Sequence, residues 1–232
     1  MNSENDRGPA PEQDGRAARW EAHRESRRLD LLRIARKAIH RLGPGASMED
    51  IAAEASTSKS VFYRYFGDKS GLRRALGRLV VEHMRTTVLE AGKAAPTEEE
   101  GLHQMVSAYL AMAQRSPNVY FFVTALDHDP FAAGARTEAA DDEEPLDTFF
   151  RDITTMMAES LTRYLNRTEP STGSDRRAQL WPQASIGMVR AAGEAWLRMP
   201  ASDAKPTHAE LTNTITGWLV HGISSPSRKA RS

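Results

Sequence analysis

Apolar side chains recur every three or four residues along most of the chain, and this spacing predicts amphipathic helices. The first clear apolar stripe extends from Leu31 to Leu42, in a helix that we expect over about residues 22–42. The Gly-Pro-Gly sequence at residues 43–45 is expected to end this helix, because neither glycine nor proline favours its continuation.

Two shorter helices are predicted next. Ser47 is suited to cap a helix of about residues 47–55, with Asp50 three residues later as its capping-box partner. After a break of turn length, Ser58 is a second N-cap candidate, and the helix that it opens ends at Gly67. Two short helices joined by a tight turn have the shape of a helix-turn-helix, whose second helix lies in the major groove of DNA.

The rest of the chain carries helical patterns separated by prolines, with no strand pairs or hairpin turns. The predicted fold class is therefore all-α, with an N-terminal three-helix domain that contains the helix-turn-helix and a second helical domain after it. The further helices are expected near residues 69–92, 97–115, 118–127, 146–167, 175–199 and 207–222.

The pattern also suggests where the domains begin and end. The N-terminal residues are rich in Pro, Gly and acidic side chains and show no periodicity, which is typical of a disordered arm. The predicted divisions are an arm over 1–20, the helix-turn-helix domain over 21–71, the second helical domain over 72–224 and a disordered tail over 225–232.

Composition narrows the class of protein. The longest uninterrupted apolar run, Val119–Val123, is far shorter than the roughly 18 residues that a membrane span needs, so no membrane partner is expected. No secretory signal is recognisable, and the absence of cysteine excludes disulfides and thiolate metal sites. We expect a cytoplasmic protein without a cofactor.

Net charge is zero, but the charges are segregated along the chain. Residues 1–85 hold 17 basic against 12 acidic side chains, whereas residues 86–232 hold 14 basic against 19 acidic ones. A basic N-terminal part is what a phosphate-binding domain requires. The Arg-rich segment of residues 16–28 also fits two other interpretations, an arm that enters the minor groove and a solvated tail of no consequence.

The sequence from Ala55 to Leu72 is the most specific feature of the chain. It is A-S-T-S-K-S-V-F-Y-R-Y-F-G-D-K-S-G-L, and it resembles the TetR-family consensus A-G-V-S-K-G-T-L-Y-x-Y-F-x-S-K-E-x-L. The resemblance covers about residues 29–79 and does not extend in sequence to the C-terminal two thirds. It implies a one-component transcription regulator that binds double-stranded operator DNA as a homodimer and is not an enzyme.

The residues of the third helix agree with this resemblance. Phe62 and Phe66 are four apart and should face the core, which directs the polar side chains between them outward. By resemblance, Lys59 and Ser60 meet base edges, Tyr63 and Tyr65 contact phosphates or sugars, and Lys69 grips a phosphate. Arg64 either reads guanine or binds phosphate. The DNA-binding candidates are Ser47, Ser58, Lys59, Ser60, Tyr63, Arg64, Tyr65 and Lys69.

Three residues depart from the family pattern or oppose it. Ser56 and Ser60 stand where family members commonly carry glycine, and if Ser56 must adopt a left-handed conformation, the turn costs about 1 kcal/mol. Glu49 lies in the first turn of the second helix, where its charge repels phosphate unless it accepts from a cytosine amino group.

The resemblance also implies a cavity for a small hydrophobic effector in the C-terminal helices. Methionine and aromatic side chains suit an irregular apolar ligand, although any one of them can equally be plain core. Tyr109, Thr124 and His128 are polar groups that could orient such a ligand. The ligand-binding candidates are Met105, Tyr109, Met112, Phe121, Phe122, Met156, Met157, Trp181 and Met188.

The last two helices are the candidates for dimerisation. Residues 184–195 are rich in Ala, Gly and Ser, which permits close helix approach, and they would pair with residues 211–223 across a two-fold axis. In the expected mechanism the fourth helix links the cavity to the DNA-binding head. Effector binding would then change the separation of the two recognition helices and release the operator.

Two other classes of function are alternatives to a ligand-responsive regulator. An enzyme would have to rely on Asp127, His128 and Asp129, which are adjacent along a helix and point in different directions, and no catalytic motif accompanies them. The second alternative is a helix-turn-helix activator or DNA-binding protein without a small-molecule effector, which ligand-dependent release of DNA would distinguish.

Overall fold

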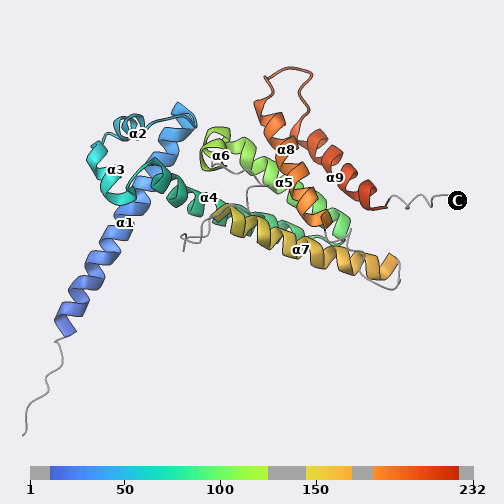
Figure 1. Cartoon of the computed structure of the whole chain (residues 1–232), viewed down its shortest axis with the longest axis horizontal. Coiled ribbons are helices and arrows are strands. Elements are labelled where there is room, and N and C mark those ends of the chain that lie inside the picture. Colours follow the sequence, from blue (N-terminus) through green and yellow to red (C-terminus); the bar gives the residue numbers. More distant parts are fainter. Residues whose placement is uncertain (1–10, 125–144, 169–179, 225–232) are drawn as a thin grey trace, which may run out of the picture. The chain divides into compact units, whose positions relative to one another are not determined.

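The computed structural model describes residues 11–124, 145–168 and 180–224, and every regular element within these ranges is a helix (Figure 1). The predicted all-α fold class is therefore confirmed for the described part of the chain. The helices are α1 (Pro11–Leu42), α2 (Met48–Glu54), α3 (Lys59–Phe66), α4 (Lys69–Ala94), α5 (Glu98–Arg115), α6 (Pro117–Thr124), α7 (Pro145–Thr168), α8 (Trp181–Arg198) and α9 (His208–Ser224).

Helix α1 begins much earlier than predicted. It starts at Pro11 rather than near residue 22, so the disordered arm expected over residues 1–20 is wrong for its second half, and residues 1–10 lie outside the described part. Residues 18–27 are all exposed, and an exposed helix has no buried face to create an apolar period. Proline is tolerated in the first helical turn, where its missing N–H has no intrahelical partner.

The other helix boundaries differ from the predicted ones by few residues. Helix α8 begins at Trp181, and the part of its predicted range before that includes residues outside the described ranges. The same is true of the predicted end of α6 at residues 125–127.

The chain divides into two compact units, Met1–Leu76 and Gly77–Ser232. The division falls within α4, five residues after the boundary that we placed between residues 71 and 72. Helix α4 is therefore a continuous part of both units.

The first unit packs α1, α2, α3 and the start of α4 around one small core. Leu31 and Ile39 of α1, Ile51 of α2, Phe62 of α3 and Leu72 of α4 are all fully buried there. Because each helix supplies a side chain to this core, the short helices α2 and α3 are held in place by packing rather than by their own helical propensity.

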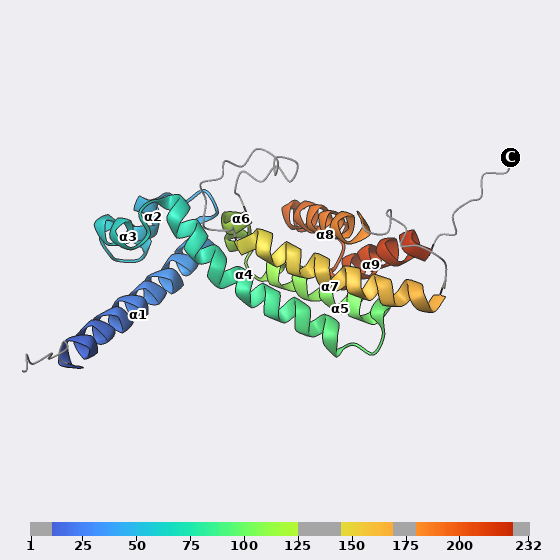
Figure 2. The same ribbon diagram turned by 60° about the horizontal axis from the view of Figure 1, so that its bottom comes forward.

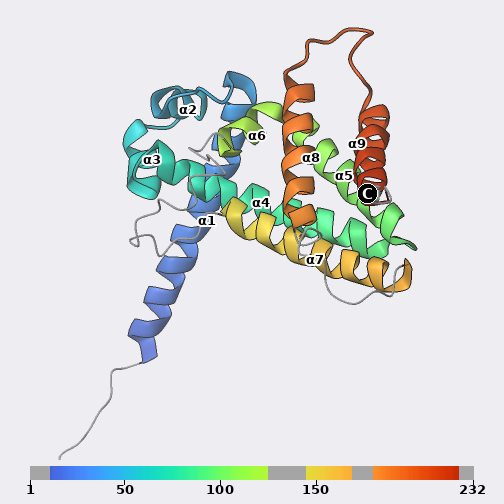
Figure 3. The same cartoon turned by 45° about the vertical axis from the view of Figure 1, so that its right-hand side comes forward.

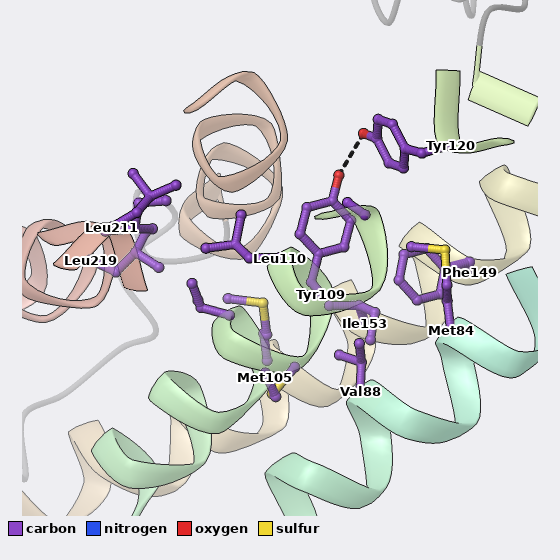
Figure 4. Packing of buried hydrophobic residues seen from close by; sticks show 14 of the residues in the cluster. Met84, Val88, Met105, Tyr109, Leu110, Tyr120, Phe149, Ile153, Leu211 and Leu219 are labelled. Carbon is purple, nitrogen blue, oxygen red and sulfur yellow. Dashed lines mark hydrogen bonds between the residues drawn. The ribbon is translucent and has the colours of Figure 1, made fainter. Parts of the chain in front are cut away.

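The second unit is built on a core to which the helices α4 to α9 all contribute (Figure 4). Buried members include Val88 of α4, Leu110 of α5, Ile153 of α7, Trp196 of α8 and Ile215 of α9. Helix α5 packs along α9, and α7 packs along α8. In Figure 2, α4, α5 and α7 lie side by side, and Figure 3 shows the connection that joins α8 to α9 at one end.

Candidate functional site

The start of α2 is closed by the capping box that the sequence predicts. The Ser47 hydroxyl accepts from the Asp50 backbone N–H at 3.1 Å, and the Asp50 carboxylate accepts from the Ser47 backbone N–H at 2.9 Å. Hydrogen bonds from Ser47 lower the pKa of the Asp50 carboxyl. Two backbone donors at the helix N-terminus are thereby satisfied, which sets where α2 begins.

The turn between α2 and α3 depends on a left-handed residue. Ser56 has φ of 48°, so the left-handed conformation is required at this position, where the family commonly has glycine. Its N–H donates to the Ala53 carbonyl at 3.0 Å, and the next N–H, of Thr57, donates to the Ala52 carbonyl at 3.1 Å. This pair of bonds is the Schellman motif, and it ends α2 so that α3 can start after two more residues.

Helix α3 has one buried face and one exposed face, as its sequence predicts. Phe62 is fully buried and Phe66 nearly so, with ring centroids 5.9 Å apart. The exposed face carries Lys59, Ser60, Tyr63 and Arg64, and Tyr63 is 40% exposed despite its aromatic ring. A helix that presents cationic, hydroxyl and phenolic groups from a rigid apolar base is suited to the edge of a nucleic-acid duplex.

Two further candidates at the start of α3 and α4 make contacts that the sequence did not predict. Ser58 is the N-cap residue of α3, but its hydroxyl makes no capping bond and instead lies 2.9 Å from the Ser60 hydroxyl. The Lys69 ammonium donates to the Gly45 carbonyl at 3.1 Å and so ties α4 to the turn before α2.

Tyr65 and Arg64 lie together on the flank of α3. Tyr65 is half-buried, with its ring 6.4 Å from that of Phe66, and the Arg64 guanidinium lies over the Tyr65 ring at 5.4 Å. This stacking restrains the guanidinium without burying it, and its N–H donors remain on the outer face.

Glu49 is paired with Lys59, its neighbour across the turn. Their hydrogen bond lowers the pKa of the Glu49 carboxyl and raises the pKa of the Lys59 ammonium. Both side chains are half exposed, so the pair is in contact with solvent. The expected repulsion between Glu49 and phosphate is therefore reduced by a cation that stands beside it.

The second unit contains a cavity of about 420 Å³. The end of α4, the start of α5, the middle of α7, Trp181 of α8 and Val220 of α9 line it. Four of the predicted ligand-binding residues are among its walls: Met105, Met156, Met157 and Trp181. Methionine and tryptophan walls are deformable and apolar, which suits a hydrophobic guest.

A smaller cavity of about 50 Å³ adjoins the first. Leu102, Met105 and Met157 belong to the walls of both, and Tyr109, also predicted, lines the smaller one. Met105 packs against Gly92 of α4, where a Cβ would lie 2.8 Å from its sulfur. Three flexible side chains thus separate two chambers of one site.

Four predicted ligand-binding residues line neither of these two cavities. Phe122 is fully buried, while Met112 and Phe121 are partly buried against the core of the second unit. Met188 is 40% exposed on α8. Apolar character alone could not separate these positions from cavity walls, because core, cavity and surface contact all use the same residue types.

The polar groups near the cavities differ from those expected. The Thr124 hydroxyl donates to the Tyr120 carbonyl at 2.8 Å, and His128 lies outside the described residues. Burial raises the pKa of Tyr109 to about 12, and burial also raises the pKa of Tyr120. The two hydroxyls lie 2.7 Å apart (Figure 4).

Sequence reasoning missed the ionic group that continues from these tyrosines. The Tyr120 hydroxyl donates to the Glu194 carboxylate at 3.2 Å, and the Arg190 Nε donates to the same carboxylate at 3.0 Å. The i,i+4 spacing of Arg190 and Glu194 was available as a signal. The hydrogen bond between Glu194 and Tyr120, which are 74 positions apart, leaves no such signal in the sequence.

Within the described residues, no group of three or more His, Cys, Asp or Glu side chains could hold a metal ion. Asp127, His128 and Asp129, the group weighed for an enzyme, lie outside those residues. No helix in the described ranges combines the length and apolarity that crossing a bilayer requires.

Two family models match the chain. One, described as bacterial regulatory proteins of the tetR family, matches residues 31–76, and the other, described as a tetracyclin repressor-like C-terminal domain, matches residues 87–229. The second match corrects our expectation that the family resemblance does not extend in sequence to the C-terminal part. A HTH-type transcriptional regulator of Mycobacterium tuberculosis H37Rv is 30% identical over 207 residues, covering 88% of this chain and 80% of its own.

Solved structures with this fold include a tetR-family regulator from Streptomyces coelicolor, with a TM-score of 0.64, 16% identity and coverage of 86% of this chain and 81% of its own. FadR from Bacillus subtilis, solved with stearoyl-CoA, has a TM-score of 0.62 and 19% identity, covering 84% and 98%. LfrR from Mycobacterium smegmatis, solved with proflavine, has a TM-score of 0.53 and 23% identity, covering 84% and 95%. Together with the family models and the 30% identical relative, these findings show that the chain belongs to the TetR family of transcriptional regulators and is not an enzyme.

Proposed function

We propose that this protein is a cytoplasmic, ligand-responsive repressor that binds a palindromic operator as a homodimer and is released by a small hydrophobic effector. The observation that carries the proposal is the exposed face of α3, with Lys59, Tyr63 and Arg64 presented from a base of buried Phe62 and Phe66. A family member needs these side chains outward, and burial of any of them would have opposed the proposal.

The proposed contacts divide by position on α3. Lys59 and Ser60, in the first turn, meet base edges, and free backbone N–H groups at the helix start favour a phosphate beside Ser58. Tyr63, Tyr65 and Lys69 contact the backbone, and Ser47 adds a contact from α2. Arg64 binds either guanine or a phosphate. On binding DNA, Lys59 gives up its ion pair with Glu49. The free-energy cost is modest because the pair is exposed to solvent.

The cavity in the second unit supports the effector part of the proposal. Its volume of about 420 Å³ lies within the range of roughly 300 to 1,000 Å³ typical of small-molecule sites, and its walls are rich in methionine. FadR and LfrR, proteins of similar fold, have been solved in complex with stearoyl-CoA and with proflavine.

The dimer is proposed to form through α8 and α9. Met188 and Trp218 are large apolar side chains that are 40% and 56% exposed on these helices. The operator demands that two recognition helices stand about 34 Å apart or a multiple of that distance. Since α4 is part of both units and its end lines the cavity, an effector can act on that separation through α4. An effector that favours, by about 1 to 3 kcal/mol, a dimer whose recognition helices do not match the operator spacing lowers operator affinity roughly 5- to 150-fold.

The first test is selection of bound DNA from a random pool by the purified protein, followed by titration of the selected operator. Lys59→Ala and Tyr63→Ala are each expected to weaken binding roughly 5- to 150-fold. Loss of the Lys59 charge should also make the affinity less dependent on salt, whereas loss of the uncharged Tyr63 should not. Glu49→Gln serves as the opposing control, because it removes the partner of Lys59 and one negative charge and should strengthen binding.

Unaltered affinity and salt dependence in the Lys59→Ala, Tyr63→Ala double variant would contradict the DNA-binding role of α3. Recovery of unrelated sequences from the pool would count against operator recognition. Expression of a reporter gene placed behind the selected operator shows whether the protein represses or activates transcription. Lower expression in the presence of the protein supports the proposal, and higher expression contradicts its repressor part.

A further inference from the structure

The smaller cavity of the second unit has apolar walls with two exceptions on α8. Phe149, Phe150 and Ile153 of α7 contribute one side of it, and Ser185 and Arg190 lie among the residues of α8 on the other. Leu102, Met105 and Met157 separate this chamber from the larger one. A guest that fills the larger chamber can therefore extend a narrow end between these side chains to α8.

Ser185 is the first exception. It is 2% exposed, and its hydroxyl has no hydrogen-bond partner among the residues that the structure describes. A buried hydroxyl without a partner is unfavourable, and such groups in native proteins call for an explanation such as a bound water or ligand. A serine hydroxyl in a helix can donate to the carbonyl one turn earlier. The Ser185 hydroxyl does not make this bond and is therefore available to donate to a ligand.

Arg190 is the second exception. Its Nε donates to Glu194, which also accepts from Arg198 at 3.2 Å. Two guanidinium groups on one carboxylate leave one positive charge uncompensated within this cluster. The Arg190 guanidinium also lies over the Phe150 ring at 6.0 Å, which restrains it beside the chamber. The residues around this largely apolar chamber thus include one with an unpaired donor and one from a cluster with a net positive charge.

We propose that the effector is an apolar monocarboxylate whose carboxyl group enters the smaller chamber, accepts a hydrogen bond from the Ser185 hydroxyl and lies against the Arg190 guanidinium, while its hydrophobic body fills the larger chamber. This inference rests on the proposed effector site and names the chemical class that the site takes. A cationic head group is disfavoured because it would face the uncompensated positive charge. A wholly apolar ligand would leave the Ser185 hydroxyl unpaired.

The test compares three probes of one chain length, dodecanoic acid, dodecan-1-ol and dodecylamine, by calorimetric titration of the full-length protein. Dodecanoate is expected to bind at least tenfold more tightly than dodecylamine, with dodecanol between them. Ser185→Ala should weaken dodecanoate binding roughly tenfold, in line with the strength of hydrogen bonds to charged groups. The melting temperature of the ligand-free variant should be unchanged or higher, because the hydroxyl removed had no partner.

Thr216→Val is the matched control. Thr216 is also buried, and its hydroxyl has no hydrogen-bond partner within the described ranges, but it lines neither cavity. This variant should therefore bind dodecanoate like the parent protein. Equal effects of the two substitutions, or binding of dodecylamine as tight as that of dodecanoate, would overturn the proposal. The operator titration is run separately: intact DNA binding together with release by a ligand that is indifferent to Ser185→Ala overturns this inference alone, whereas loss of DNA binding in the parent protein overturns the proposed function.

Discussion

At the scale of single residues, the buried hydroxyls of Tyr109 and Tyr120 show how a polar group is kept inside an apolar core. Tyr120 donates to Glu194, which leaves its oxygen to accept from Tyr109 at 2.7 Å. Their rings meet edge to face, with centroids 6.2 Å apart. Neither hydroxyl is left without a partner, and the pair links α5 to α6 and α8.

Tyr120→Phe is therefore expected to destabilise the protein by about 1 to 3 kcal/mol, because it leaves the Tyr109 hydroxyl buried and unpaired. Equilibrium unfolding in urea measures this change. The double variant Tyr109→Phe, Tyr120→Phe removes both groups and should lose less than the single one, since Glu194 keeps Arg190 and Arg198. A double variant less stable than Tyr120→Phe alone would refute this account.

At the scale of elements, the first unit depends on how its short helices begin and end. Helix α2 has a complete capping box at Ser47, whereas α3 has Ser58 at its N-cap without a side-chain cap bond. Helix α4 begins close behind α3, and a Cβ on Gly71 would overlap the carbonyl oxygen of Phe66. These local features help to orient α3 on the core. A weakened cap is therefore expected to disturb the exposed face of α3 as well as to lower stability.

The two serine caps provide a matched pair of substitutions. Ser47→Ala is expected to lower the free energy of unfolding by about 0.5 to 2 kcal/mol. The Asp50 N–H loses its acceptor, and the Asp50 carboxylate, which accepts from the Ser47 N–H, loses the hydroxyl that also bonds to it. Ser58→Ala should cost much less, since no backbone N–H depends on its hydroxyl. Thermal unfolding of both variants decides the point, and equal losses would contradict the assignment of the caps.

At the scale of the whole molecule, the proposed function requires two copies of the chain. Met188 and Trp218 lie exposed on α8 and α9, the two helices proposed for the dimer, where association would remove their apolar surface from water. Operator symmetry then follows from the two-fold symmetry of the dimer. The repressor proposal thus relies on an interface whose exposed side chains, Met188 and Trp218, line neither cavity.

Trp218→Glu should weaken the dimer by about 2 kcal/mol or more, roughly thirtyfold or more in its dissociation constant, because buried tryptophans dominate interface energies. Analytical ultracentrifugation over a concentration series measures this shift, and operator affinity should fall with it. Trp20→Glu is the control: Trp20 is 77% exposed but belongs to the first unit, and its replacement should leave the oligomeric state as it was. A Trp218→Glu protein that remains as dimeric as the parent would exclude α9 from the interface.

Much of the first unit could be predicted from sequence because its signals are local. The period of apolar residues, the Ser47 cap, the strained Ser56 turn and the faces of α3 all depend on neighbours within a few positions. The start of α1 at Pro11 was missed for the same reason, since an exposed helix leaves no apolar period to recognise.

The sequence by itself determined the helical fold class, the helix-turn-helix and the face of α3 that points outward, since periodicity and capping are properties of short segments. Only the tertiary structure decided which apolar residues line a cavity, that Glu194 meets Tyr120, and that the Ser185 hydroxyl lies unpaired at a cavity wall. The reason is that these contacts join residues far apart in the chain, where packing alone selects among side chains of the same apolar or polar type.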